Sequence, residues 1–542
     1  MRLKENSTEQ KLRGAYYTPV ALAQAMVDMF TDYEIESVLE PSCGDGVFLD
    51  CAVESGLMQA IEEFVAVEID SAESAKLNNR YSVTDNITIL NEDFLRYYEK
   101  AVNNKSFDLI LGNPPYIRYQ YLSEQQREIQ SKILTSNGMK SNKLINSWVC
   151  FLVACVQLLS SNGKIAFVIP AEILQVAYAE DLRLFLSNNL SKITLLTFEK
   201  LVFPNIEQEV VVFIGEKGNV EKGIRIIELR TLDDLKNLDL QGNGFQEIQH
   251  LKEKWTRYFI TAEENELIKS IKVDKRFRKF SDCALINVGI TTGNNKFFSI
   301  SETTEKKYEL ESVCLKLIGR SSHADGLFFN DSDWQNNINK GKNAYLINFP
   351  DIPFNEYPEK HKKYITTGEK MDEHKGYKCT IRDRWYIVPS IWVPDAFFLR
   401  RNNLFPKFVL NCCDAVSTDT MHRVKFHEGI DKELVLLSYY NSISFAFTEL
   451  CGRSYGGGVL ELLPRETGNI MMPNIKNIEL QIKNRLLFEI DLILRENSNI
   501  EKALDIVDRE VLVNILNIDP AICDRCRVIW RKMQNRRLGR GN

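Results

Sequence analysis

FDLILGNPPY, residues 107–116, is the stretch of sequence that decides the fold. Its apolar first half predicts a buried strand, and Asn113 begins the loop that follows the strand. Pro114 and Pro115 have no N–H group and hold the residues before them extended, so the loop presents hydrogen-bond acceptors rather than donors. The side-chain oxygen of Asn113 and the carbonyl of Pro114 can accept two hydrogens from one exocyclic amine, and Tyr116 offers a flat face on which a ring can stack.

Outward from this strand, short apolar runs alternate with helical stretches between residues 37 and 216. The alternation is typical of repeated βαβ units, which form a mostly parallel sheet. One predicted helix, over 19–30, precedes the first strand, and a longer one, over 143–160, precedes the fifth. We therefore expect an α/β domain over residues 1–220 with one doubly wound, seven-stranded sheet, whose strands are SVLEP (37–41), EFVAVEID (63–70), ITIL (87–90), FDLILGN (107–113), KIAFVIP (164–170), KITLLTF (192–198) and EVVVFIG (209–215).

The first strand ends in a glycine-rich turn, within the stretch VLEPSCGDGVFL at 38–49. Gly44 and Gly46 allow a sharp bend and a close approach to a ligand, and the helix that follows begins with free N–H groups. The turn lacks the third glycine of the dinucleotide-binding fingerprint. The carboxylate of Glu40, at the end of the strand, favours a cationic ligand over a pyrophosphate.

Acidic side chains also end the second and third strands. In VAVEID (65–70), Glu68 can accept both hydroxyls of a ribose, although either Glu68 or Asp70 could instead cap the next helix. In LNEDFL (90–95), Asp93 can accept the amino group of an adenine, with Phe94 against its ring. These residues and Asn113 all follow strand ends, where a doubly wound sheet binds its ligand, so together they predict a nucleoside site.

Together these motifs resemble the class I S-adenosylmethionine-dependent methyltransferases, and more closely the gamma-class DNA adenine-N6 methyltransferases of restriction-modification systems. RGAYYTPVALAQAM (13–26) is similar to the amino-terminal cofactor motif of that family, and FPNIEQEVVVFI (203–214) is a further match. The motifs also follow one another in the gamma order. The resemblance implies transfer of a methyl group from S-adenosylmethionine to the N6 amine of an adenine flipped out of duplex DNA (EC 2.1.1.72), without a metal ion.

The resemblance also assigns roles to individual residues. It implies catalysis by Asn113, Pro114, Pro115 and Tyr116, and stacking of the flipped base on Tyr116 and Phe203. It implies cofactor binding by Tyr17, Thr18, Pro19, Glu40, Pro41, Gly44, Gly46, Glu68, Ile69, Asp93, Phe94, Asn113 and Phe151.

The alternation of strands and helices stops after residue 220. We expect a connecting segment over 221–275, a mixed α+β target-recognition domain over 276–475 and a helical carboxyl-terminal region over 476–542. Four segments of this half are rich in Thr, Asn, Arg and His beside glycine-rich loops, and such residues suit contacts to phosphates and base edges. The segments that resemble the recognition regions of the family are VGITTGNNKFF (288–298), RDRWY (382–386), STDTMHRV (417–424) and RSYGGGVLEL (453–462).

The charge of the chain divides at the same place. The net charge of -6 argues against a nucleic-acid partner if it is taken for the whole chain. However, residues 1–220 hold 19 Lys and Arg against 29 Asp and Glu, and residues 221–542 hold 49 against 45. All six histidines follow residue 249, so the first domain has no imidazole to act as a base. We expect the contacts to duplex DNA in the basic half, including its tail of seven cations between Arg525 and Arg540.

Some alternatives stay open at this point. The same loop suits transfer to a glutamine amide of a protein or to a guanine amine of RNA, and the chain could be a non-catalytic DNA specificity subunit. No Pro-Cys occurs, so the chemistry of cytosine-carbon methylation is excluded. Twelve irregularly spaced cysteines and a polar amino terminus indicate a cytoplasmic protein, and no apolar run is long enough to span a membrane. We expect a monomer, with any cognate restriction endonuclease on a separate chain.

Overall fold

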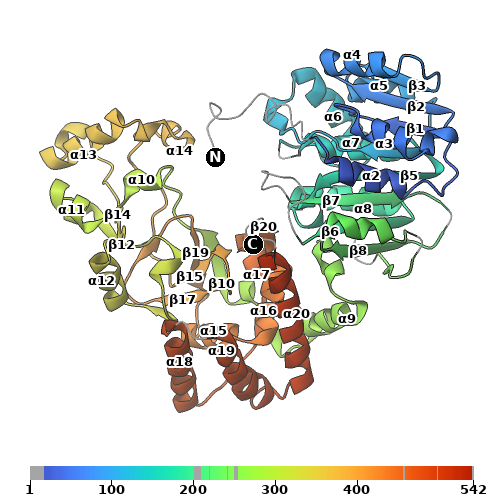
Figure 1. Cartoon of the computed structure of the whole chain (residues 1–542). Coiled ribbons are helices and arrows are strands. Elements are labelled where there is room, and N and C mark those ends of the chain that lie inside the picture. The colour runs from blue at the N-terminus through green and yellow to red at the C-terminus, as the bar shows by residue number, and fades with distance from the viewer. Residues whose placement is uncertain are drawn as a thin grey trace. The chain divides into compact units, whose positions relative to one another are not determined.

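The computed structural model of the chain describes residues 17–143, 145–199, 209–218, 220–240, 242–248, 254–455, 458–496 and 499–539. The chain folds into two compact units, Met1–Ala262 and Glu263–Gly541 (Figure 1). The boundary falls within residues 221–275, the segment expected to connect two domains. Each unit has its own hydrophobic core.

The first unit is built on one eight-stranded sheet with the strand order β3-β2-β1-β4-β5-β7-β6-β8. Neighbouring strands run parallel, except that β7 is antiparallel to both β5 and β6. This doubly wound, mostly parallel sheet confirms the predicted fold class. All seven predicted strands are present, as β1 (Ser37–Glu40), β2 (Glu63–Glu68), β3 (Ile87–Asn91), β4 (Phe107–Gly112), β5 (Leu159–Pro170), β6 (Lys192–Phe198) and β7 (Val210–Glu216).

The prediction of seven strands was one strand short. β8 (Gly223–Leu229) lies in the predicted connecting segment and pairs in parallel with β6. Its sequence, GIRIIEL, places Arg225 and Glu228 within an apolar run. Arg225 is nonetheless buried, because its guanidinium donates hydrogen bonds to Thr194 and to four backbone carbonyls of the loop that follows β8. A charged side chain satisfied in this way hides a strand from a search based on apolar patterns.

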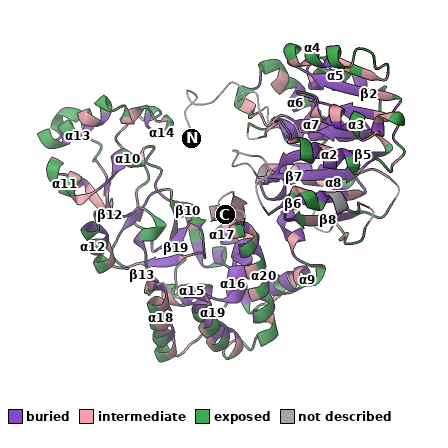
Figure 2. Cartoon of the chain, in the orientation of Figure 1, coloured by how far each residue is buried: buried purple, intermediate pink, exposed green. Residues whose placement is uncertain are grey.

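Helices cover both faces of the sheet. Because side chains alternate along a strand, Ile165 and Phe167 of β5 face one core, whereas Ala166 and Val168 face the other. Figure 2 shows buried residues throughout the sheet and on the inner faces of the helices. One core packs against α2 (Val20–Asp28), α3 (Val47–Glu54) and α4 (Ser71–Arg80), and the other against α5 (Phe94–Ala101), α6 (Glu124–Ser136), α7 (Ser147–Gln157) and α8 (Glu180–Asn189).

The helix α7 is apolar on all sides, since ten of its eleven residues are buried. Such a helix belongs in the core of a protein rather than on its surface. No helix in the described ranges combines the length and the apolar composition that crossing a membrane requires.

The strand order reverses at β1, which pairs with β2 on one side and with β4 on the other. From β1 the chain builds outward through β2 and β3, and then returns to add β4 on the opposite side. A doubly wound sheet binds its ligand at such a reversal, outside the carboxyl ends of the strands. The turns after β1 and β4 therefore flank the expected ligand crevice.

The second unit mixes small sheets with helices (Figure 1). Its strands are β9 (Phe277–Lys279), β10 (Ala284–Val288), β11 (Ser299–Ile300), β12 (Cys314–Ile318), β13 (Phe328–Phe329), β14 (Tyr345–Ile347), β15 (Ala396–Leu399), β16 (Arg401–Asn402), β17 (Phe408–Asn411), β18 (Val416–Ser417), β19 (Met421–Phe426), β20 (Arg453–Tyr455), β21 (Val459–Glu461) and β22 (Met471–Pro473). The sheet orders are β10-β19-β15-β17-β13, β11-β14-β12-β18, β16-β21-β20 and β22-β9.

Helices surround these sheets and form the end of the chain. They are α9 (Ala262–Val273), α10 (Asn295–Phe298), α11 (Glu302–Tyr308), α12 (Asp331–Asn339), α13 (Glu359–Lys370), α14 (Tyr377–Thr380), α15 (Lys432–Tyr439), α16 (Ser442–Cys451), α17 (Pro464–Gly468), α18 (Leu480–Arg495), α19 (Ile500–Val507), a π-helical turn (Asp508–Val513) and α20 (Pro520–Gly539).

Five of the seven cations expected to form a DNA-binding tail are engaged in the fold, and Arg540 lies outside the described residues. Arg537 on α20 is fully buried, and its guanidinium lies 2.8 Å from the carboxylate of Glu449 on α16. Arg525, Arg527, Arg531 and Lys532 also contact partners inside the second unit. We therefore no longer expect these five side chains to supply the contacts to DNA.

The buried pair of Arg537 and Glu449 gives a stability prediction. Arg537→Ala leaves a carboxylate in the core without its partner, and we expect it to lower the free energy of unfolding by about 3–5 kcal/mol in urea titrations. Arg525→Ala, at an exposed position of the same helix, should change it by less than about 0.5 kcal/mol. Equal stability of the two variants would contradict this role of α20.

Candidate active site

Four acceptor side chains lie in a row along one edge of the sheet in the first unit. Glu40 and Glu68 are the last residues of β1 and β2, and Asp93 and Asn113 closely follow β3 and β4. These four strands are adjacent, in the order β3-β2-β1-β4, and the three strand pairs are parallel. Residues that are up to 73 positions apart in the sequence thus share one edge.

The carboxylate of Glu68 joins the first two strand ends. One oxygen accepts a hydrogen bond from the N–H of Gly44 at 2.8 Å, and the other accepts one from the N–H of Asp70 at 2.7 Å. Burial raises the pKa of Glu68, and these two hydrogen bonds oppose the shift. Each oxygen keeps a second lone pair, so the carboxylate can still accept two hydroxyl groups. Asp70 caps α4, which answers the question of which acidic residue does so.

Glu40 is a buried acid that lacks a partner. Its side chain is 1% exposed, and its Oε2 has no hydrogen-bond partner among the described residues. Burial raises the pKa of Glu40 well above its ordinary value, and the neighbouring carboxylates of Asp45 and Glu68 add to the shift. Burying a carboxyl group without a partner is costly, so this position suits a ligand that brings a positive charge or a donor.

The glycine-rich turn is shaped for close approach. Gly46 has φ +84° and precedes the first residue of α3, and a Cβ at this position would lie 2.4 Å from the side chain of Leu77. Gly44 has φ +56°, and a Cβ there would lie 3.4 Å from the ring of Tyr17. Tyr17, which belongs to the amino-terminal motif and is 45% exposed, therefore packs over the turn.

The Asn113 side chain has a fixed orientation. Its Nδ2 donates a hydrogen bond to the hydroxyl of Thr18 at 3.1 Å, so its Oδ1 faces the opposite way. Thr18 is buried, and Pro19 follows it at the amino-terminal end of α2. The contact brings together two predicted site motifs that are 95 residues apart.

The loop after Asn113 is held from three sides. The Tyr116 hydroxyl donates to the carbonyl of Val168 in β5 at 3.0 Å, which anchors the tip of its ring. The Ser147 hydroxyl, at the start of α7, accepts from the N–H of Ile117 at 2.9 Å and donates to the carbonyl of Pro115. On the other side, Pro41 packs against Gly112, where an added Cβ would lie 3.5 Å from the proline ring. The acceptor atoms of the loop are thus positioned in advance.

Asp93 and the two phenylalanines are more buried than their predicted roles suggest. Asp93 caps α5 with one oxygen and accepts from the Gln126 side chain with the other, at 2.8 Å. Phe94 and Phe151 pack against each other with ring centroids 4.9 Å apart, and both are less than a tenth exposed. Ile69, by contrast, is 63% exposed beside Glu68.

One predicted site residue is not described by the structure, and two residues that contact the site were not predicted. Phe203 lies outside the described residues. Ser147 and Gln126 were not expected in the site, because no local pattern links either residue to the strand ends. The one available signal is the capping pattern Ser-x-x-Gln, which predicts the start of α6 and thereby places Gln126 on its first turn.

The second unit brings together the four recognition-like segments. The guanidinium of Arg382 donates to the carbonyls of Thr291 and Thr292 at 2.9 and 2.8 Å. Gly289 packs so closely on the backbone of Thr418 that an added Cβ would lie 1.9 Å from its carbonyl oxygen. His422, which is buried, contacts the carbonyl of Leu462 at 2.6 Å. Arg382 and His422 thus connect the segments to one another instead of facing outward.

A polar cleft of about 650 Å³ lies where two of these segments meet. None of its lining residues is acidic, and three carry positive charge. Arg320 is exposed, and its side chain has no partner within the described ranges. The lining residues are Asn295, Lys296, Ser299, Gly319, Arg320, Ser322, His323, Lys342, Asn343, Thr418 and Thr420.

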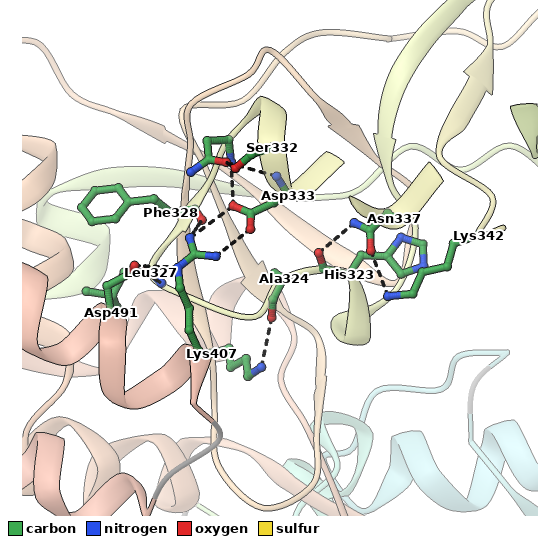
Figure 3. Close-up of polar contacts among 12 residues, drawn as sticks. His323, Ala324, Leu327, Phe328, Ser332, Asp333, Asn337, Lys342, Lys407 and Asp491 are labelled. Carbon is green, nitrogen blue, oxygen red and sulfur yellow. Dashed lines mark hydrogen bonds and ion pairs between the residues drawn. The ribbon is translucent and has the colours of Figure 1, made fainter. Parts of the chain in front are cut away.

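Figure 3 shows hydrogen bonds that hold two lining residues of this cleft, His323 and Lys342, through Asn337. Asn337 donates to the carbonyl of His323 at 2.9 Å and accepts from the Lys342 ammonium at 2.8 Å. Burial, with the charges of Lys342 and Arg320, lowers the pKa of His323 to about 4. His323 is therefore neutral near pH 7, and Lys296 is paired with Glu373, so the positive charge of the cleft comes from Arg320 and Lys342.

The first site fits S-adenosylmethionine. This molecule has a sulfonium and an ammonium group, a ribose and an adenine. Glu40 offers a buried acceptor without a partner to the positive charge, and Glu68 offers two oxygens to the ribose. Within the described residues no cluster of His, Cys, Asp or Glu suits a metal ion. Fold and site together define a class I S-adenosylmethionine-dependent methyltransferase, with S-adenosylmethionine as its cofactor.

Two family descriptions match most of the chain. Residues 54–203 match the Eco57I restriction-modification methylase family, and residues 252–512 match the carboxyl-terminal domain of the Type II methyltransferase M.Eco57I. The chain is a modification DNA methyltransferase of the kind found in restriction-modification systems.

Individual relatives are similar over long stretches. The chain is 24% identical to the Type II methyltransferase M.AccI of Acinetobacter calcoaceticus over 534 residues, which cover 93% of this chain and 94% of the relative. It is 27% identical to M.HindII of Haemophilus influenzae over 58% of this chain and 60% of that protein. Among solved structures, the Type IIL restriction-modification enzyme MmeI, determined in complex with DNA, shares its fold, with 13% identity, a TM-score of 0.57, and coverage of 99% of this chain and 78% of MmeI.

The raised pKa values of Glu40 and Glu68 give a prediction for cofactor binding. A cationic ligand prefers both carboxyl groups ionised, so its affinity is complete above their raised pKa values and falls as the pH decreases through them. We expect this loss to begin at a higher pH than the ordinary glutamate value of 4.5 implies.

Calorimetric titration of S-adenosylmethionine into wild type and variants checks this pH dependence and also tests the role of Glu68 alone. Glu68→Gln should weaken binding of S-adenosylmethionine at least about tenfold in calorimetric titrations, because a charge-assisted acceptor is lost. Glu63→Gln, at the opposite end of the same strand, is the control and should bind normally. Equal affinities for the two variants would exclude Glu68 from the cofactor site.

Proposed function

We propose that the protein transfers the methyl group of S-adenosylmethionine to the N6 amine of adenine in duplex DNA. The observation that carries this proposal is the acceptor loop of Asn113, Pro114 and Pro115, which hydrogen bonds hold at the same edge of the sheet as Glu40 and Glu68. An amine that donates two hydrogens is the nucleophile that such a loop suits. A cytosine carbon would need a thiol nucleophile, which this loop lacks.

The chain's part in the reaction is positioning. The cofactor supplies a methyl group that its positive sulfur already activates. Asn113 Oδ1 and the Pro114 carbonyl accept the two amine hydrogens, which directs the nitrogen lone pair out of the ring plane. Thr18 holds the Asn113 amide in the required orientation. As the new N–C bond forms and the old S–C bond breaks, a proton leaves the nitrogen for solvent. Positioning of this kind lowers a barrier by about 7–11 kcal/mol.

The adenine must leave the helix to reach this loop. Flipping a base out of a duplex costs a few kcal/mol, which stacking on an aromatic ring offsets in part. Tyr116 offers such a ring, and its hydroxyl is anchored to the carbonyl of Val168. Phe203 is the second stacking residue that the family resemblance implies, and it remains a prediction.

We assign the cofactor's parts along the row of strand ends. Tyr17, Thr18 and Pro19 lie with Glu40 around the methionine part, and Glu68 binds the ribose. The adenine lies between Asp93 and the exposed side chain of Ile69. Phe94 and Phe151 support this position from the core beneath it rather than by stacking on the ring.

We propose that the second unit recognises the DNA sequence, through the polar cleft that Arg320 and Lys342 line. Positive charge suits phosphates, and the Asn and Thr side chains of the cleft suit base edges. We further propose a monomer acting in the cytoplasm, with any cognate nuclease on another chain. The structure forms no disulfide among the described cysteines, which supports a reducing compartment.

Asn113 provides the direct test of the chemistry. We expect Asn113→Ala to reduce methyl transfer to duplex DNA at least about a thousandfold, since orientation effects of this size are lost with the acceptor. Its affinity for S-adenosylmethionine should remain within about threefold of wild type, and Asn104→Ala, exposed at the far edge of the sheet, is the control.

To identify the substrate, S-adenosylmethionine with a labelled methyl group is incubated with the protein and, in separate reactions, with duplex DNA, RNA or protein extract. Retained turnover in Asn113→Ala would contradict the mechanism. Labelling of RNA or protein in preference to DNA would contradict the substrate.

The cleft of the second unit has its own test. Arg320→Gln should weaken duplex binding and reduce the dependence of log Kd on log salt by about one unit, as expected for one lost phosphate contact. Arg485→Gln, an exposed cation on α18 paired with Glu489, should leave the slope unchanged. A wild-type slope in Arg320→Gln would exclude this arginine from the DNA contacts.

A further inference from the structure

The cations of the catalytic unit are almost all engaged with partners. Thirteen lysines and arginines lie between residues 17 and 199. Six of them form ion pairs with carboxylates, and four more contact carbonyl, amide or aromatic groups. In this described range, with residue 144 excepted, only three exposed cations lack a side-chain partner, namely Arg118, Lys140 and Lys143.

The three unpartnered cations lie on two loops that touch each other. Arg118 follows the catalytic loop, two residues after Tyr116, and its backbone forms an antiparallel bridge with Asn146. Lys140 and Lys143 lie on the segment that leads into α7 and contains Asn146. The backbone N–H of Lys140 donates to Asp181, so an acidic group lies beside it. Among the described residues, Arg118 and Lys143 form no ion pair with a carboxylate, and we name this pair the basic edge.

The backbone that carries Arg118 is fixed from behind. The guanidinium of Arg127, on α6, donates to the carbonyls of Tyr119 and Gln120 at 3.1 and 3.0 Å. The same guanidinium lies over the Tyr119 ring, 5.1 Å from its centroid. On the other side of Arg118, Ile117 exchanges hydrogen bonds with Ser147 at 2.9 Å. A rigid backbone fixes the point from which the exposed guanidinium extends, so binding a phosphate there orders the side chain but not the loop.

A flipped nucleotide constrains where phosphates must lie. When its base enters the pocket beside Asn113 and Tyr116, its two flanking phosphates stay attached and remain at the mouth of that pocket. The Cα atoms of Arg118 and Tyr116 are at most about 7 Å apart, because two residues of chain join them. The rest of this unit is acidic and repels DNA. A positive charge is therefore required at this point and is present there.

We propose that the basic edge, Arg118 and Lys143, binds the phosphates that flank the flipped adenine. The inference rests on the proposed function, because it takes adenine in duplex DNA as the substrate. It adds a contact that the catalytic unit itself makes with the backbone of the target strand. The sequence-specific contacts of the second unit are separate from it.

The test uses the full-length protein and a duplex that contains its methylated motif. The double variant Arg118→Gln, Lys143→Gln should reduce the slope of log Kd against log salt by roughly two units, since each phosphate contact contributes roughly 0.9. Its affinity for S-adenosylmethionine should equal that of wild type, which shows that the site is intact. Lys105→Gln is the matched control, because this lysine is exposed, pairs with Glu63 and precedes β4 at the opposite edge of the sheet.

Neutral methylphosphonates in the duplex locate the contact. Replacing the phosphate on either side of the target adenine should weaken binding of wild type and of Lys105→Gln several-fold, but should cause no further loss in the double variant. An unchanged salt slope in the double variant, or an equal methylphosphonate effect in all three proteins, would overturn the proposal. Failure of wild type to methylate DNA would instead refute the proposed function, so the two failures are distinguishable.

Discussion

The acceptor-only loop after β4 is the constraint on which the rest of the catalytic unit depends. Two prolines remove the donors, and Asn113 provides an acceptor beside them. Such a loop is useful only if its atoms do not move, and the structure fixes it through Thr18, Ser147 and the backbone of Val168. In the proposed mechanism the fixed geometry replaces a catalytic base, which agrees with the absence of histidine from the first 249 residues.

Electrostatics divides the work between the two sides of the reaction. The cofactor side collects buried carboxylates, of which Glu40 has an oxygen without a partner among the described residues. The DNA side needs the opposite charge, and we propose that a few exposed cations supply it. The cations of α20 are engaged inside the second unit, whereas Arg320 and the basic edge keep theirs exposed. The net charge of each half of the chain thus indicated a DNA partner, but it did not indicate which cations are exposed and able to contact DNA.

Much of this could be predicted because it is local. Apolar runs gave all seven predicted strands, and the polar residues that end them share one edge because the strands are parallel. β8 was missed because Arg225 breaks its pattern and finds its partners in a loop that follows it. The contacts of Asn113 with Thr18 and of Arg537 with Glu449 join residues 95 and 88 positions apart, and no local pattern encodes such pairs.

The central claim concerns the atom that receives the methyl group. The most direct measurement is modified-base sequencing of DNA from a host that expresses the protein, compared with the same host expressing Asn113→Ala. The account predicts N6-methyladenine at one short sequence motif with the wild-type protein and none with the variant. Methylation of cytosine, or an equal pattern of methyladenine with both proteins, would contradict it.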